Sequence, residues 1–350
     1  MEQKPKSREI EPLHSKAYDK LRRLCDVLCV PGSKIPPNSD EFLTNILLRR
    51  DCDYSRLRIS ALAVIQSYTG TMQMLENAWN NNLEQLDNSL KNGQIVVFLN
   101  LPLVQALLRT TTIPDLRFEL LLTHTRLRLL ECACDPNWFY DDETFNVAVS
   151  ISLYAFSTEY IFPESEYETN LLEKLIKLAI NKPNAFRISV LAAYRRLLDI
   201  EQLNSKTLAQ VLSSDRFSKD LARVQIYEPQ YERQLSALIP SITFVENNVS
   251  LEVQSHYAES PYPRWLSHTY NSAVSAPVFF QRACPNVDLN TFSSDDTIKI
   301  LVAGCGTGRV AIEERLMWQN ANVVAMDLSK PSLAFAQRCS DELGLDSISF

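Results

Sequence analysis

The sequence predicts a mainly α-helical N-terminal domain followed by an incomplete α/β doubly wound domain. The first observation is that apolar residues recur every three or four positions from about Leu13 to about Glu259, which is the spacing of amphipathic helices. The second is a change after Asp296, where continuous apolar runs alternate with helix-forming stretches. The third is the clustering of three of the seven glycines within residues 304–308, directly after the first apolar run.

Length and composition narrow the class of protein. The chain has 350 residues, of which 45% are hydrophobic and 22% are charged, so it can bury a full core and is not a disordered chain. Its net charge of −7 argues against a nucleic-acid partner, because proteins that track phosphates usually carry a basic surface. The charged start MEQKPKSREIEP lacks the apolar core of a secretory signal, and no apolar run is long enough for a membrane helix. We therefore expect a cytoplasmic protein with no membrane association.

The helical region divides into a polar tail and an irregular helical domain. Residues 1–12 contain two prolines and many charges, which predicts a loose tail, and residues 13–245 form the predicted helical domain. No repeat of fixed length is present in it, so a regular solenoid is not expected. The clearest helical patterns lie at 114–134, 142–160, 166–181 and 184–199.

Potential reactive side chains within the helical domain have structural interpretations. His124 lies among leucines and arginines, so we interpret it as a structural histidine. Cys132 and Cys134 lie at a helix end, and we expect them to face the core. The eight cysteines form no CxxC pair, and the chain has only four histidines, so no metal site is predicted. Free thiols of this kind are typical of a reducing compartment.

The C-terminal region reads as strand–helix–strand–helix–strand, the order of a parallel sheet with crossover helices. Residues 246–296 are predicted to be a helix and a linker rich in proline and aromatic residues, and residues 297–350 to be the first part of the α/β domain. Continuous apolar runs suggest strands that are buried on both faces. The expected elements are strand 298–303, helix 309–320, strand 323–326, a helix capped by Ser329 that ends before Gly344, and strand 347–350.

The glycine turn at residues 304–308 is the strongest chemical signal. Glycines permit unusual backbone angles and leave room for a ligand, and the following helix start offers free N–H groups and a positive dipole end. Asp327 ends the next strand, where a carboxylate can accept hydrogen bonds from a ribose diol. The combination predicts a site for a nucleoside-containing cofactor; the alternative is a purely structural turn.

These residues resemble a known enzyme family. Residues 298–308, IKILVAGCGTG, resemble motif I of the class I S-adenosylmethionine (SAM)-dependent methyltransferases, and residues 323–329, VVAMDLS, resemble motif II. Residues 226–265 are similar to the segment before this core in a group of bacterial methyltransferases, many with a helical, often tetratricopeptide-repeat, domain upstream. The resemblance implies a Rossmann-like fold, SAM as cofactor and methylation of an unidentified acceptor, either a small molecule or a protein. The helical domain would be a surface for a protein partner.

The resemblance also assigns candidate cofactor-binding residues. It implies that the glycines let SAM approach the backbone, that Asp327 binds the ribose, and that Leu328 packs on the adenine, although Leu328 as core filler is an alternative. The full set is Gly304, Cys305, Gly306, Thr307, Gly308, Asp327 and Leu328. Val302 departs from the family, which usually has an acid two residues before the first glycine.

The predicted core is shorter than the family's, because only three strands are recognisable. We therefore expect this chain to be an N-terminal fragment of a methyltransferase and inactive alone, with the alternative that a partner chain completes the fold. No catalytic residue can be assigned, since the region that usually lines the transfer site would follow Phe350.

Two other functions compete with a methyltransferase. One is a helical interaction scaffold with a vestigial nucleotide-binding-like domain, which the short core and Val302 favour. The other is an NAD-linked enzyme, because Asp327 would serve the ribose of NAD equally well. The dinucleotide pattern G-x-G-x-x-G needs glycine at position 309, where this chain has Arg309.

The segment 261–265, PYPRW, is an unusual polar–aromatic cluster with His256 and Tyr257 just before it. Its prolines restrict the backbone, and its tyrosine, arginine and tryptophan offer stacking and hydrogen-bonding surfaces. One hypothesis is a lid over the cofactor, in which case Tyr262 or Arg264 should lie near the glycine turn or Asp327. The other is a linker in which Trp265 plugs the junction between domains.

Overall fold

The computed structural model of the chain describes residues 21, 23, 25, 27, 34–49, 52, 54–242, 261, 263–268, 273–284, 286, 293 and 295–350. Its contacts divide the chain into two compact units, one made mainly of residues 53–229 and one mainly of residues 230–350. Among the described residues, none of the helices combines the length and apolarity needed to cross a membrane. Each unit is described by itself below.

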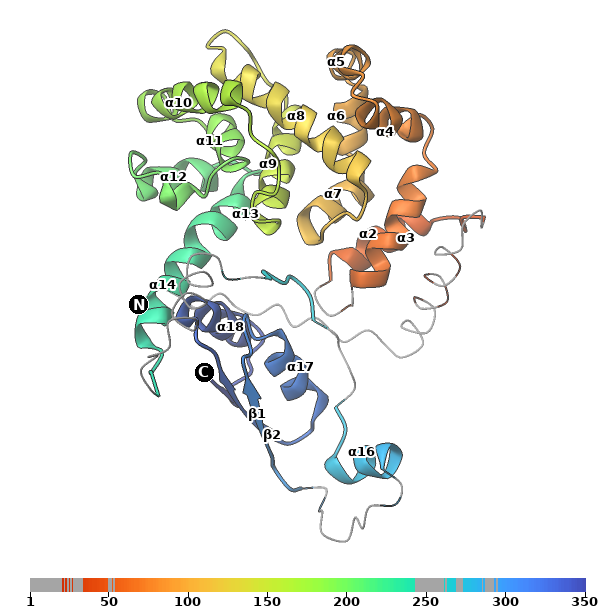
Figure 1. Ribbon diagram of the computed structural model, residues 1–350, viewed down its shortest axis with the longest axis vertical. Coiled ribbons are helices and arrows are strands. Elements are labelled where there is room, and N and C mark those ends of the chain that lie inside the picture. The colour runs from red at the N-terminus through yellow and green to blue at the C-terminus, as the bar shows by residue number, and fades with distance from the viewer. Residues whose placement is uncertain are drawn as a thin grey trace. The chain divides into compact units, whose positions relative to one another are not determined.

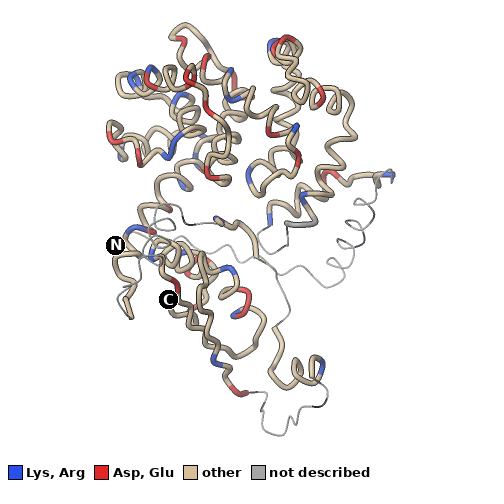
Figure 2. Tube along the Cα trace, in the orientation of Figure 1, with Lys and Arg blue, Asp and Glu red and all other residues tan. Residues whose placement is uncertain are grey.

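Every regular element in the described part of the first unit is a helix (Figure 1). Helix α8 contacts α4 on one side and α10 on the other, while α9 contacts α7 and α11 in the same way. Acidic and basic residues alternate along the chain of these helices without gathering on one of them (Figure 2). The α-helices are α2 (Ser39–Leu47), α3 (Tyr54–Gln66), α4 (Thr71–Trp79), α5 (Leu83–Lys91), α6 (Gln94–Leu99), α7 (Pro102–Thr110), α8 (Leu116–Cys134), α9 (Asp142–Ser157), α10 (Glu166–Asn181), α11 (Ala185–Ala192), α12 (Ser205–Ser213) and α13 (Lys219–Ala222).

Side-chain caps explain where several of these helices begin. Asp115, Asp141 and Asn184 each accept a hydrogen bond from a backbone N–H in the first turn of α8, α9 and α11. Ser165 and Glu168 form a reciprocal capping box at the start of α10. The helices predicted at 114–134 and 166–181 are therefore confirmed almost to the residue.

Two helix ends in this unit differ from the prediction for reasons that involve backbone conformation and tertiary contacts. Helix α9 ends at Ser157 instead of residue 160, because Glu159 and Tyr160 adopt left-handed backbone angles. Helix α11 ends at Ala192, and the predicted remainder contains the short 3-10 helix η1 (Leu197–Asp199). The side chain of Gln225 accepts from the Leu197 N–H and donates to the Ala192 carbonyl, which satisfies groups that a longer helix would have paired.

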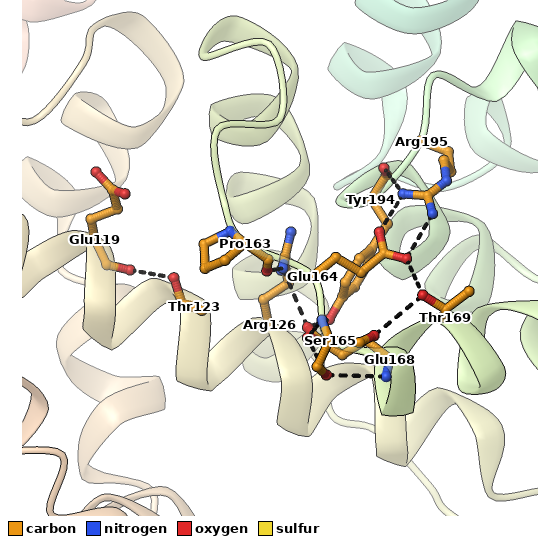
Figure 3. A network of polar contacts seen from close by, with 10 residues as sticks. All are labelled: Glu119, Thr123, Arg126, Pro163, Glu164, Ser165, Glu168, Thr169, Tyr194 and Arg195. Carbon is orange, nitrogen blue, oxygen red and sulfur yellow. Dashed lines mark hydrogen bonds and ion pairs between the residues drawn. The ribbon is translucent and has the colours of Figure 1, made fainter.

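Helix α8 carries a buried charge at the centre of its core face. Phe118, Leu121 and Leu130 are fully buried, whereas Leu116 in the first turn is 54% exposed. Arg126 is also buried, and its Nη2 donates to the Pro163 carbonyl at 2.6 Å. Figure 3 shows how this arginine meets residues of α10 and of the segment after α11.

The carboxylate of Glu168 is the partner of this buried arginine. Arg126 Nη2 lies 3.3 Å from Glu168 Oε1, and the Tyr194 hydroxyl donates to the same oxygen at 2.9 Å. The guanidinium also lies 4.0 Å from the centre of the Tyr194 ring. The other oxygen, Oε2, accepts from the N–H and hydroxyl of Ser165. One side chain thus caps α10 and neutralises a charge from α8.

The second unit contains a three-stranded parallel sheet in the order β1-β2-β3, which confirms the predicted strand–helix–strand–helix–strand order. The register pairs Ile298 with Ala321 and Ala303 with Met326, so β1 and β2 end together. The chain is therefore mostly helical with a small parallel sheet near residue 350. The elements are α14 (Glu228–Leu238), which starts in the first unit, α16 (Ala276–Ala283), β1 (Ile298–Ala303), α17 (Arg309–Met317), β2 (Ala321–Met326), α18 (Lys330–Glu342) and β3 (Ile348–Ser349).

The described residues cover only one face of the sheet, so its strands are not buried on both faces as their apolar runs suggested. Exposed apolar surface of this kind is what a core with only three recognisable strands is expected to leave. Val323 and Ala325 of β2 are buried in one cluster with Ile312 of α17 and Phe335 of α18. Because both crossovers run in the same direction across the sheet, both helices lie on the same face. On the opposite face Leu301 is 65% exposed, and Val324 and Met326 are also exposed.

Contacts divide the chain between Pro229 and Gln230, within α14. The predicted end of the helical domain at residue 245 lies outside the described residues. From Gln230 on, α14 belongs to the C-terminal unit, and its Glu232 is buried there. Residues 1–12 and 246–260 lie outside the described residues.

Candidate functional site

The glycine turn connects β1 to α17 in a backbone conformation that favours glycine. Gly304, Gly306 and Gly308 have φ angles of +67°, +53° and +77°. The N–H groups of Gly304 and Cys305 both donate to the Met326 carbonyl, at 2.8 and 3.1 Å. These bonds hold the turn against the end of β2.

The three glycines have different surroundings. A Cβ atom on Gly308 would lie 2.3 Å from the Cβ of Ala336 in α18, so this glycine allows two helices to pack closely. A Cβ atom on Gly304 or Gly306 would meet no other atom within 4 Å. These two glycines therefore face open space, where a ligand can approach the backbone.

Asp327 lies at the glycine turn, as the sequence predicted from its place at the end of β2. Its Oδ2 accepts from the Gly306 N–H at 2.8 Å, and its Oδ1 accepts from the Ser329 N–H at 2.9 Å. Ser329 in turn caps α18 by accepting from the Ser332 N–H. Because each carboxylate oxygen has a second lone pair, Asp327 retains the capacity to accept from a diol.

Of the remaining candidate residues, Cys305 is largely shielded from solvent and Leu328 is exposed. Burial, and secondly the charge of Asp327, raise the pKa of the Cys305 thiol to about 12, so the thiol is neutral near pH 7 and is a poor nucleophile. Leu328 is 42% exposed and leaves apolar surface beside Asp327. That exposure suits a flat apolar ligand group better than core filling.

Thr307 is buried in the turn and is held by the segment 263–265. Its hydroxyl donates to the Pro263 carbonyl at 2.8 Å, and its own carbonyl accepts from Trp265 Nε1 at 2.8 Å. The segment thus lies at the carboxyl ends of the strands, where the lid hypothesis requires it. His256, Tyr257 and Tyr262, which belong to that hypothesis, lie outside the described residues.

Arg264 pairs with a residue that the sequence analysis missed. Its Nη1 lies 3.4 Å from Oε2 of Glu232, whose other oxygen accepts from Arg338 Nε at 2.9 Å. The Trp265 ring packs edge-on against Phe335, with ring centroids 5.8 Å apart. No local pattern links position 232 with 264 and 338, because they come from separate elements, so sequence reasoning had no signal for this cluster.

The candidate side chains of the helical unit are His124, Cys132 and Cys134. His124 Nε2 lies 2.9 Å from Asp87 Oδ1, and burial lowers the pKa of the imidazole. Burial raises the pKa of Cys132 to about 11 and also raises that of Cys134. Within the described ranges, no group of three or more His, Cys, Asp or Glu side chains is arranged to hold a metal ion.

Comparison with protein-family models, with curated proteins and with solved structures finds no match to this chain. The class is therefore defined by the fold and the site alone. The chain has a helical unit and a parallel α/β unit. In the second unit a glycine turn at the end of β1 meets an aspartate at the end of β2.

Proposed function

We propose that this chain binds SAM at the glycine turn and is a SAM-dependent methyltransferase, or the cofactor-binding part of one. The observation that carries the proposal is the meeting of Asp327 with the Gly306 N–H beside open space at Gly304 and Gly306. This arrangement supplies a carboxylate for a ribose diol and room for a ligand at the backbone.

The residues at the turn fit the parts of SAM. The start of α17 provides backbone N–H groups and a positive dipole end, which favour the carboxylate of the methionine portion. Asp327 would hold the ribose hydroxyls, and the exposed side chain of Leu328 would contact the adenine. When bound, SAM supplies a sulfonium methyl group that a nucleophile of the acceptor displaces. The protein's part in such a transfer is mainly to orient the two reactants.

An NAD-linked enzyme is the second candidate, because Asp327 would bind the ribose of either cofactor. The structure offers one observation against it. Arg309 begins α17 where a dinucleotide turn has its third glycine, and its Nε donates to Glu313 at 3.0 Å. The close-packing role of that third glycine is instead filled one position earlier, where Gly308 meets Ala336.

Calorimetry on the 350-residue chain tests the proposal with SAM, S-adenosylhomocysteine and NAD as separate ligands. We expect saturable binding of the first two and no binding of NAD. Asp327→Ala should weaken binding by about tenfold or more, because hydrogen bonds to a charged group contribute about 1.5–3 kcal/mol. Gly306→Val should abolish binding by filling the open space.

Asp346→Ala is the matched control, since Asp346 is an exposed acid before β3, at the opposite ends of the strands. It should bind like the wild type. Binding of NAD alone, no binding of any of the three ligands, or equal affinities of the Asp327 and Asp346 variants would each overturn the proposal. The second outcome would leave an interaction scaffold as the better description.

A further inference from the structure

The segment 263–265 makes two hydrogen bonds to a single residue of the glycine turn. Thr307 donates through its hydroxyl and accepts through its carbonyl, so both its side chain and its backbone are held. The residue is 3% exposed and stands between two glycines in left-handed conformation. The segment therefore restrains the part of the turn that has the greatest intrinsic freedom.

The segment is itself anchored by a buried ion-pair cluster. Glu232 of α14 accepts from Arg264 through Oε2 and from Arg338 of α18 through Oε1. The three side chains are 8%, 11% and 7% exposed, respectively. Both guanidinium groups also lie over the ring of Phe335, at 5.6 and 4.9 Å from its centre. We call these three charged residues the Glu232 cluster.

Helix α14 is attached to α18 at further points along its length. Lys330 Nζ donates to the Ile239 carbonyl at 2.7 Å, and the Tyr231 hydroxyl donates to Asp341 at 3.0 Å. Helix α18 begins shortly after Asp327. The Glu232 cluster thus connects α14 to α18 through Arg338, and to the segment that holds the glycine turn through Arg264, which is next to Trp265.

Such an attachment affects ligand binding as well as folding. A turn with three glycines has many accessible conformations, and a ligand that needs one of them must offset the lost entropy. A turn that is already held in one conformation binds more tightly, because that cost has been met on folding.

We propose that Trp265 acts directly, and Arg264 and Glu232 indirectly, as positioning residues that hold the glycine turn in its ligand-binding conformation. The inference rests on the proposed function, since it concerns affinity at that site. It assigns Arg264 no contact with the ligand, in contrast to the lid hypothesis.

Trp265→Phe is the most direct test. Phenylalanine keeps an aromatic ring for packing on Phe335 but has no N–H to donate to the Thr307 carbonyl. We expect the affinity for S-adenosylhomocysteine to fall by about three- to tenfold, the effect of one neutral hydrogen bond. In the ligand-free chain, amide hydrogen exchange should become faster in residues 304–309 and remain unchanged in β2.

Glu232→Gln tests the indirect part, with Glu342→Gln as its matched control. Glutamine has no negative charge, and its NH₂ group would face one of the two arginines in place of the oxygen that now accepts from it. Glu342 also pairs with Arg338, at 2.7 Å, but from the same helix, one turn further along α18. We expect faster exchange in residues 304–309 and weaker binding for the Glu232 variant only. Should that variant fail to fold, Trp265→Phe still decides the inference.

The outcomes separate the inference from the proposed function. Unchanged exchange and unchanged affinity in Trp265→Phe, with a wild type that binds, would overturn the inference alone. Faster exchange with unchanged affinity would also overturn it, because the contacts would then be only structural. A wild type that binds neither SAM nor its demethylated product would overturn the proposed function, whatever the exchange shows.

Discussion

Alanine is expected to destabilise the C-terminal unit more at Gly308 than at Gly306, because only Gly308 packs against another helix. In Gly308→Ala the new Cβ would lie 2.3 Å from the Cβ of Ala336 and 3.3 Å from its Cα, and the residue would keep a φ of +77°. A left-handed conformation costs an alanine about 1–2 kcal/mol. Overpacking against a buried helix adds about 1–3 kcal/mol. We therefore expect a loss of about 2–5 kcal/mol for the C-terminal unit.

Gly306→Ala is the internal control, because its Cβ meets no atom within 4 Å and only the backbone cost of about 1–2 kcal/mol applies. Amide hydrogen exchange in α17 and α18 measures the opening of this unit, and each 1.4 kcal/mol raises the exchange rate about tenfold. We expect clearly faster exchange for the Gly308 variant than for the Gly306 variant. Relative to the stability that each variant loses, ligand affinity should fall more in Gly306→Ala than in Gly308→Ala.

A double-mutant cycle tests whether the contact with Ala336 causes the loss of stability in Gly308→Ala. If the contact with Ala336 is responsible, Ala336→Gly should recover part of the loss in the Gly308→Ala background, giving a favourable coupling energy of about 1 kcal/mol or more. Equal exchange in the two single variants, or zero coupling in the cycle, would refute the reasoning that Gly308 serves helix packing.

Three further predictions concern buried groups. Glu168→Gln should destabilise the helical unit by about 3 kcal/mol, because it leaves the Arg126 charge buried without its carboxylate. Urea unfolding followed by circular dichroism measures this loss of stability, and a loss under about 1 kcal/mol would contradict the prediction. Alkylation at pH 8 should be slower at Cys305, whose pKa is raised to about 12, than at the exposed Cys284, as measured by mass spectrometry; faster labelling of Cys305 would contradict it. Burial lowers the pKa of His124, so the buried neutral imidazole adds stability above about pH 6.5 that is lost as the pH falls below it. His124→Gln should therefore make the free energy of unfolding less dependent on pH in this range. An unchanged pH dependence would contradict the interpretation of His124 as a buried structural histidine.

Elements with local signals were predicted best from the sequence. Helices α8 and α10 begin where Asp115 and Ser165 supply capping oxygens, and such caps depend only on residues within the first turn. Strand β1 was predicted to the residue from its apolar run. Helix α11 was predicted too long, because its end depends on Gln225, a residue more than thirty positions away along the chain.

The sequence by itself determined the place of the candidate site, since strands of a parallel sheet end at the same edge and Asp327 had to approach the glycine turn. It could not determine that Gly308 packs against Ala336 while Gly304 and Gly306 face open space. Nor could it determine that Glu232 joins Arg264 to Arg338, or that one face of the sheet is uncovered by the described residues. Caps and strand ends follow from short-range spacing along the chain. Contacts between separate elements depend on how those elements pack, and only the tertiary structure decides that.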